Sequence, residues 1–141
     1  MPDYYIGLMS GTSMDAIDAA LIGCSGNTIK LIAHHSQMLS SDTRQQIDEL
    51  CQGCTNEIQK MQQLDIELGK QFANCANHLL KETQLKANDI IAIGSHGQTL
   101  RHYPEASIRN SLQIADPNTI AELTGITTVA DFRRRDMASG G

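Results

Sequence analysis

The sequence predicts an α/β fold in which an antiparallel three-stranded meander is followed by alternating helices and strands. Three observations support this: short apolar runs with glycine turns near the N-terminus, one long stretch of helical periodicity, and compact β-branched segments after it. The 141 residues are 40% hydrophobic and 19% charged, a balance typical of one globular domain. We therefore expect a single domain over residues 1–141.

The first part of the chain supplies the predicted meander. Residues 4–10, 17–23 and 28–38 form short apolar runs, each suited to a strand. The pair Gly26-Asn27 between the second and third runs is a strong turn signal. Consecutive strands joined in this way pair antiparallel.

Two helices are predicted next. Ser41 to Thr43 offer N-caps for a helix that continues through Leu50. Between Asn56 and Glu82, apolar residues recur every three or four positions, which predicts a long amphipathic helix.

The last part alternates strands with one more helix. Strands are predicted over 90–94, 111–115 and 127–130, and a helix over 117–124 that begins at a proline and ends before Gly125. The main order, β-β-β-α-β-α-β, resembles the ribonuclease-H-like lobe of actin, hexokinase and sugar kinases, in which right-handed crossovers add parallel strands to a meander.

Composition excludes several classes of partner. A net charge of −5 is unsuited to nucleic acid, which requires a surplus of basic residues. No apolar run reaches the length of a bilayer span, and the first residues lack the pattern of a signal peptide. Four cysteines without an export signal indicate reduced thiols. We therefore expect a cytoplasmic protein without nucleic-acid or membrane partners.

The loop between the first two strands is the first candidate site. It comprises Gly11, Thr12, Ser13, Met14, Asp15, Ala16, Ile17 and Asp18. A glycine followed by small hydroxyl residues can direct N–H groups and hydroxyls toward phosphate oxygens. Asp15 and Asp18 could hold Mg²⁺ through water. The alternative is a hydroxyl-rich hairpin turn with no ligand.

Two more polar motifs follow predicted strands. His96, Gln98 and Thr99 offer donors and acceptors for a hydroxyl-rich ligand, and the alternative is that His96 only stabilises a turn. In the run 131–136, an arginine could hold a carboxylate through two hydrogen bonds, although such runs are commonly solvated salt-bridge patches. Three polar motifs at strand ends together favour a binding site.

Zinc binding is a further hypothesis. Cys51 and Cys54, and Cys75 and His78, have spacings compatible with a structural zinc site, which would make the chain a zinc-stapled domain. Packed or exposed free thiols are the preferred interpretation, because Cys75 and His78 lie on the predicted long helix.

Four motifs together resemble the anhydro-N-acetylmuramic acid kinases of bacteria: residues 7–15, 93–99, 116–125 and 130–136. The resemblance implies two ribonuclease-H-like lobes, ATP with Mg²⁺ between them, and a homodimer. It also implies a reaction that opens the 1,6-anhydro ring of the sugar while O6 is phosphorylated, in cell-wall recycling.

Site roles follow from the same resemblance. Gly11 to Asp18 correspond to the ATP phosphate loop, and His96, Gln98 and Thr99 to sugar contacts. Arg135, with Arg133 next, is expected to bind the lactyl carboxylate. The family's catalytic aspartate belongs to a motif resembling Asp-Thr-Gly-Pro-Gly that these 141 residues do not contain.

We therefore expect a truncated N-terminal lobe that is inactive alone. The alternative from another class is a non-catalytic sugar-binding or assembly module. Ala16 and Ala115 stand where the family usually has glycine, and Ser139 replaces a small apolar residue. A side chain at Ala16 would be costly if the loop required a positive φ there.

Overall fold

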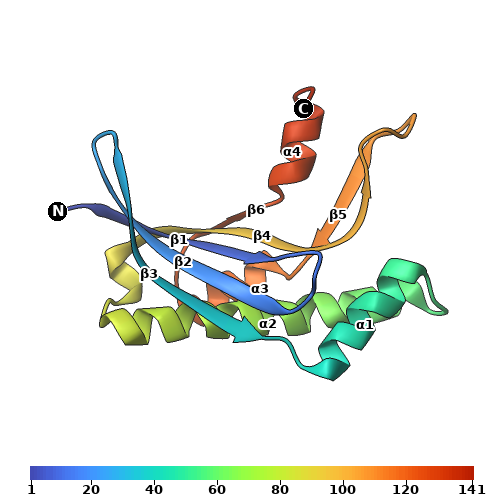
Figure 1. Ribbon diagram of the computed structural model, residues 1–141, viewed down its shortest axis with the longest axis horizontal. Coiled ribbons are helices and arrows are strands. Elements are labelled where there is room, and N and C mark those ends of the chain that lie inside the picture. Colours follow the sequence, from blue (N-terminus) through green and yellow to red (C-terminus); the bar gives the residue numbers. More distant parts are fainter.

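The N-terminal meander forms as predicted. In the computed structural model, which describes residues 1–141, β1 (Asp3–Ser10), β2 (Ala16–Ser25) and β3 (Thr28–Met38) pair antiparallel in sequence order (Figure 1). Gly26 makes the turn between β2 and β3 with φ +56°, a left-handed conformation that favours glycine.

The two helices after the meander also match the prediction closely. The side chain of Ser40 accepts a hydrogen bond from the Thr43 N–H at 3.1 Å and caps α1 (Ser41–Gln52). The following helix, α2 (Glu57–Thr83), is the longest element. None of the helices combines the length and the apolar character that crossing a bilayer requires.

The remaining elements form the second part of the sheet and its connections. They are a short 3-10 turn, η1 (Ala87–Asp89), then β4 (Ile90–Tyr103), β5 (Asn110–Ile114), α3 (Pro117–Thr124), β6 (Thr128–Ala130) and α4 (Phe132–Ala138). The bounds of α3 are those predicted, and Gly125 ends it with φ +69°.

The sheet has the topology of a ribonuclease-H-like lobe. Its order is β3-β2-β1-β4-β5, and β6 also pairs with β4. Both β1 and β6 run parallel to β4, whereas β5 is antiparallel to it. Along one edge, β4 therefore pairs first with β6 and then with β5. The predicted fold class is confirmed, with the β4–β5 hairpin extending it.

One predicted boundary was wrong, and one helix was not predicted. The strand expected over 90–94 continues to Tyr103, because the backbone passes through Gly97 at φ +76° and β4 then takes β5 as its partner. The charged run was not predicted to be helical, yet it forms α4. That helix has no buried residue, so the run contains no apolar stripe that would have identified it.

One face of the sheet packs against three helices to form the core. In Figure 1, α1, α2 and α3 lie on one side of the sheet and α4 lies on the other. Phe72 of α2 is the largest fully buried side chain in the cluster. Gly69 allows α2 to approach the start of α3, since a Cβ there would lie 2.9 Å from the Asp116 carbonyl oxygen. This close approach packs the start of α3 against α2.

Candidate functional site

The three polar motifs meet around the middle of β4. Ser10, the last residue of β1, pairs with Gln98 of β4. Ala130, the last residue of β6, pairs with Ser95 of β4. The loop after β1 and the charged run after β6 therefore leave the sheet on opposite sides of the segment 95–98. The first and third motifs follow the ends of β1 and β6 as predicted, whereas His96, Gln98 and Thr99 lie within β4 and not at its end.

The strand changes partners at that same segment. β4 pairs with β6 up to Ser95 and with β5 from Gln98, and Gly97 lies between the two pairings. A Cβ on Gly97 would collide with the carbonyl oxygen of Ile114. The change of partner separates β5 from β6 and leaves space between them. This space lies beside the carboxyl end of the parallel strand β6, and ligands of open α/β sheets bind outside such strand ends.

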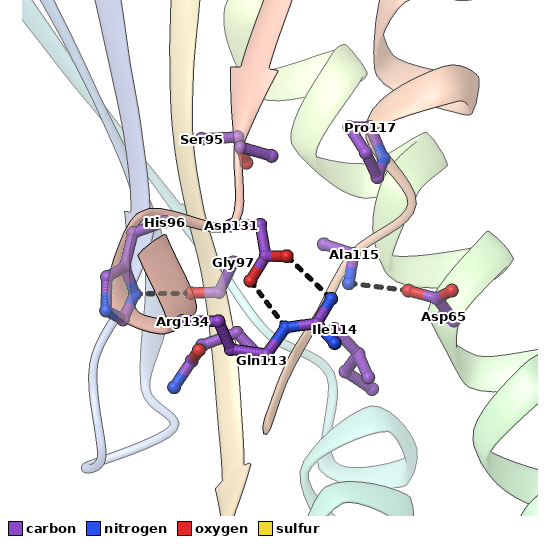
Figure 2. Close-up of a pocket in the computed structure, with 11 residues that line it drawn as sticks. Asp65, Ser95, His96, Gly97, Gln113, Ile114, Ala115, Pro117, Asp131 and Arg134 are labelled. Carbon is purple, nitrogen blue, oxygen red and sulfur yellow. Dashed lines mark hydrogen bonds and ion pairs between the residues drawn. The ribbon is translucent and has the colours of Figure 1, made fainter. Parts of the chain in front are cut away.

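A cavity of about 270 Å³ occupies this space (Figure 2). Its walls come from β4, β5, α2 and the segments after β5 and β6. The lining residues are Asp65, Ser95, His96, Gly97, Gln113, Ile114, Ala115, Pro117, Ala130, Asp131 and Arg134. A small, mostly polar hollow of this kind suits a hydrophilic ligand.

Ser95 contributes an unpaired polar group to the cavity wall. Its side chain is 2% exposed, and its Oγ is the one buried side-chain oxygen or nitrogen without a hydrogen-bond partner. Such groups are rare in proteins because they lose hydration without compensation. The Ser95 hydroxyl is therefore a buried group beside the cavity that lacks a hydrogen-bond partner.

His96 links the cavity to the arginine run. Its Nδ1 lies 3.1 Å from the Gly97 carbonyl oxygen, and its Nε2 accepts a hydrogen bond from Arg133 Nε at 2.9 Å. Because Nε2 accepts, the proton of the neutral ring is on Nδ1, where it can be donated to Gly97. The His96 ring thus orients Arg133 without neutralising its positive charge.

The two arginines that follow Arg133 differ in their ion pairing. Arg134 donates two hydrogen bonds to the Asp131 carboxylate, at 2.7 and 2.6 Å, and these bonds raise the pKa of its guanidinium further. Arg135 is exposed, and its side chain has no hydrogen-bond or ion-pair partner. The charge of Arg134 is therefore compensated, whereas those of Arg133 and Arg135 remain available to an anion.

Gln98 and Thr99 do not line the cavity. Gln98 is 1% exposed and accepts a hydrogen bond from Ser10 Oγ at 2.6 Å, which joins β1 to β4. Thr99 Oγ1 accepts one from Gln113 Nε2 at 3.2 Å. Among the five predicted substrate residues, only His96 lies in the cavity wall. Arg133 donates a hydrogen bond to His96 but does not itself line the cavity.

The predicted phosphate loop is an exposed turn followed by a strand. Thr12 and Ser13 are exposed, and the Met14 N–H donates to the Gly11 carbonyl at 3.1 Å. Met14 has φ +55°, whereas Ala16 belongs to β2 and has no positive φ. The strain anticipated at Ala16 is therefore absent.

The remaining residues of the loop segment face different ways. Ile17 is fully buried in the core, so its side chain does not reach the loop. The carboxylate of Asp15 lies 3.9 Å from Arg44, and that of Asp18 lies 3.3 Å from His34. Both carboxylates are more than half exposed and hence accessible to a hydrated cation.

Asp65 of α2 is a cavity residue that the sequence did not identify. Its carboxylate accepts a hydrogen bond from the Ala115 N–H at 2.8 Å, beside an Ala115 φ of +115°. Burial raises the pKa of Asp65, the Ala115 hydrogen bond partly offsets this, and the charge of Asp116 raises it further. Gly69, one turn later, was the available signal, since glycine within a helix indicates close approach.

Asp116 caps α3 below the cavity. Its carboxylate accepts hydrogen bonds from the N–H groups of Asn118, at 3.3 Å, and Thr119, at 2.8 Å. Burial alone would raise the pKa of Asp116, but hydrogen bonds from the side chains and N–H groups of Thr119 and Asn118 lower it overall.

We expect Asp116→Ala to lower the free energy of unfolding by about 1 kcal/mol at neutral pH, because α3 loses its N-cap. Because the pKa of Asp116 is lower in the folded state than its ordinary value of 3.8, the ionised carboxylate stabilises the fold fully at pH values above 3.8. This stabilisation is lost as the pH falls through the folded-state pKa. Urea unfolding should show that the difference in free energy of unfolding between Asp116→Ala and wild type is smaller at acidic pH than at neutral pH. Asp116→Asn retains an acceptor and should lose less; a pH-independent deficit would contradict this assignment.

The proposed zinc set does not assemble. Cys51 Sγ lies against the Thr99 carbonyl at 4.0 Å, whereas Cys75 Sγ lies in the core, 3.5 Å from the Ile17 carbonyl. Burial raises the pKa of Cys75 to about 11, so it remains a thiol. Cys51, Cys54, Cys75 and His78 do not form a common group of ligands, so the zinc-stapled domain is not supported.

The sheet order, the polar motifs around the middle of β4 and the cavity beside them are consistent with an actin-like sugar-kinase lobe. The model of the anhydro-N-acetylmuramic acid kinase family matches residues 3–141, and the chain belongs to that family.

Curated relatives agree with this assignment. The anhydro-N-acetylmuramic acid kinase of Shewanella frigidimarina (strain NCIMB 400) is 50% identical over 140 residues, covering 99% of this chain and 38% of the relative. That of Shewanella sp. (strain ANA-3) is 51% identical over 138 residues, covering 98% and 37%. The chain therefore spans less than two fifths of the length of these relatives.

Proposed function

We propose that the whole protein is an ATP-dependent kinase that opens the anhydro ring of 1,6-anhydro-N-acetylmuramic acid with water and phosphorylates O6. The products are N-acetylmuramic acid 6-phosphate and ADP, and the role is cell-wall recycling and amino-sugar catabolism. The observation that supports it best is the convergence of the three polar motifs on the segment 95–98 of β4. Membership of the family supplies the identity of the substrates.

In this proposal, the loop Gly11 to Asp18 holds the phosphates of ATP. Thr12 and Ser13 present exposed hydroxyls, and Asp15 and Asp18 present carboxylates of the kind that bind hydrated Mg²⁺. ATP with Mg²⁺, when bound, supplies the γ-phosphoryl group and neutralises part of its charge. The contribution of the chain is to position these groups at the end of β1.

The sugar is assigned to the cavity beside β4. We assign the Ser95 hydroxyl, which is buried beside the cavity and has no partner, to a sugar hydroxyl. Arg133, held by His96, and the unpartnered Arg135 are the candidates for the lactyl carboxylate, since Asp131 occupies Arg134. Gln98 acts by fixing β1 against β4, and Thr99 by fixing Gln113 of the cavity wall.

The general base that activates water is assigned to a part of the protein outside residues 1–141. We therefore expect no turnover from these residues alone. We also propose a cytoplasmic location and a homodimer for the full-length protein. A sugar-binding module without chemistry is the alternative, and turnover by the full-length protein would exclude it.

The test is a coupled ATP-consumption assay on the full-length protein with two sugars. One is 1,6-anhydro-N-acetylmuramic acid, and the other is 1,6-anhydro-N-acetylglucosamine, which lacks the lactyl carboxylate. Wild type should strongly prefer the first. Arg133→Ala should lower kcat/KM for it by about 10- to 100-fold, the value of a charged hydrogen bond, while the second sugar is little affected.

Arg135→Ala is tested in the same way, and Lys70→Ala on the exposed face of α2 is the control. Equal losses on both sugars would show that Arg133 does not bind the carboxylate. An absence of turnover from folded full-length protein would contradict the proposed function itself.

A further inference from the structure

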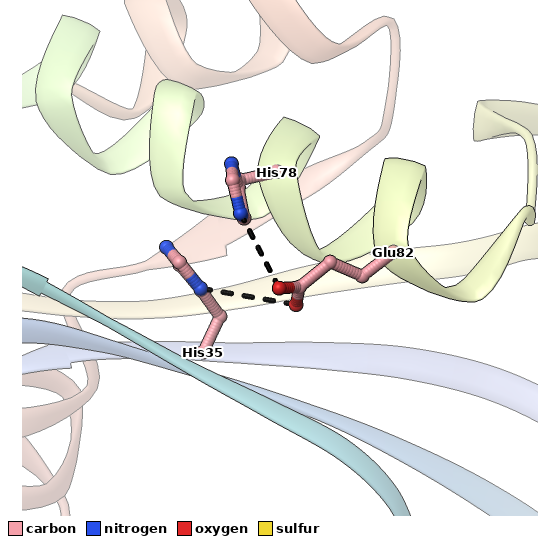
Figure 3. A group of neighbouring side chains, drawn as sticks. All are labelled: His35, His78 and Glu82. Atoms are coloured by element: carbon pink, nitrogen blue, oxygen red, sulfur yellow. Dashed lines mark ion pairs between the residues drawn. The ribbon is translucent and has the colours of Figure 1, made fainter.

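Two histidines and a glutamate meet near β3, at the opposite edge of the sheet from the cavity. His35 lies on β3, whereas His78 and Glu82 lie one turn apart on α2 (Figure 3). Glu82 Oε1 is 3.3 Å from His78 Nε2, and Glu82 Oε2 is 3.8 Å from His35 Nδ1. The two imidazole rings stack with centroids 4.0 Å apart. The kinase chemistry proposed above uses none of these residues.

The spacing of the donor atoms matches that of a metal site. One nitrogen of each histidine and one carboxylate oxygen all lie within 4.8 Å of one another. Ligands bound to Zn²⁺ at about 2.0–2.1 Å in a tetrahedron are about 3.4 Å apart. The distance from Glu82 Oε1 to His78 Nε2 is close to this value, whereas His35 Nδ1 lies nearer the other carboxylate oxygen, so binding one ion requires a shift of the histidine rings. Imidazole nitrogen with one carboxylate favours Zn²⁺, Ni²⁺ or Cu²⁺ over Mg²⁺ or Ca²⁺, which prefer oxygen.

We propose that His35, His78 and Glu82 form a three-ligand site for a divalent transition-metal ion of the Zn²⁺ class. The fourth position is left to water, as in other sites with three protein ligands. The two rings are stacked, so their nitrogen lone pairs, which lie in the ring planes, do not yet converge on one point. His78 is about half exposed, and rotation about its soft Cβ–Cγ torsion turns its Nε2 toward the ion.

The site would add a direct link between two elements that already pack against each other. β3 is an edge strand of the sheet, and α2 packs beneath it. An ion bound to both would fasten the edge strand to the C-terminal part of α2, because binding to the folded state alone adds stability. The buried Cys75 thiol, one turn before His78, is not a ligand.

The experiment is a Co²⁺ and Zn²⁺ titration of the full-length protein and four variants. Co²⁺ should give visible d–d absorption at one equivalent, without the near-ultraviolet charge-transfer band that a thiolate ligand would produce. His35→Ala, His78→Ala and Glu82→Gln should each weaken binding by more than about tenfold, since even outer-shell losses cost that much.

His34→Ala is the matched control, because His34 directly precedes His35 on β3 and its side chain lies beside Asp18 on the opposite face. It should bind as wild type does. Zn²⁺ should also raise the Tm of wild type and His34→Ala but not of His78→Ala, and circular dichroism without metal reports whether each variant folds. Binding that is unaffected in folded His78→Ala, or no binding by wild type, would overturn the proposal.

Discussion

Gly97→Ala is expected to lower the free energy of unfolding by about 3 kcal/mol, because it combines a left-handed backbone with a steric clash. Gly97 has φ +76°, and an added Cβ would collide with the Ile114 carbonyl oxygen. Ile114 is paired with Gln98 in the β4–β5 ladder, so its carbonyl cannot withdraw without disrupting the hairpin. Urea unfolding followed by circular dichroism measures the loss.

Gly26→Ala separates the two causes. Gly26 has φ +56°, but an added Cβ there would meet nothing within 4 Å. It should therefore show only the backbone cost, about 1 kcal/mol. If the two variants lost equal stability, the close approach between β4 and β5 would not be the reason for glycine at position 97. The inference that β4 needs glycine where its partner changes from β6 to β5 would then be wrong.

Elements with strong local signals could be predicted from the sequence. The helix α3 begins at Pro117 after the Asp116 cap and ends before Gly125, so residues at each end determine both of its boundaries. The apolar stripe of α2 likewise requires only helical periodicity. These predictions succeed because the interactions that decide them lie within a few positions along the chain.

The extent of β4 could not be predicted for the opposite reason. Ser95 and Gly97 resemble turn residues, but the strand continues because β5, more than ten residues later, supplies new backbone partners. A glycine within a strand is compatible with either a turn or a bulge, and only the distant pairing decides between them.

In the candidate site, too, the local motifs could be predicted from the sequence, but the contacts between distant residues could not. The motifs around Gly11, His96 and Arg133 could be found by resemblance to a family, yet their individual contacts could not. Neither the hydrogen bond that joins Gln98 to Ser10 nor the one that joins Arg133 to His96 has a local signature. Asp65 reaches the site only because α2 passes close to α3 at Gly69.

Phe72→Ala is expected to lower the free energy of unfolding by about 3–5 kcal/mol, the cost of removing a buried aromatic side chain from a core. Phe72 is 0% exposed and lies on the buried face of α2. The matched control on the same helix is Ile58→Ala, where the side chain is 71% exposed and the loss should stay within about 0.5 kcal/mol. Urea unfolding of both variants provides the comparison.

The variant also tests how α2 positions the cavity. Phe72 and Asp65 lie on the same helix, and the Asp65 carboxylate holds the Ala115 N–H of the cavity wall. If packing at Phe72 fixes that helix, Phe72→Ala should speed hydrogen exchange at Ala115, and Phe72→Leu should do so less because it leaves a smaller void. Exchange at Ala115 that stays slow while global stability falls would mean that α3 and the Asp116 cap hold the wall without α2.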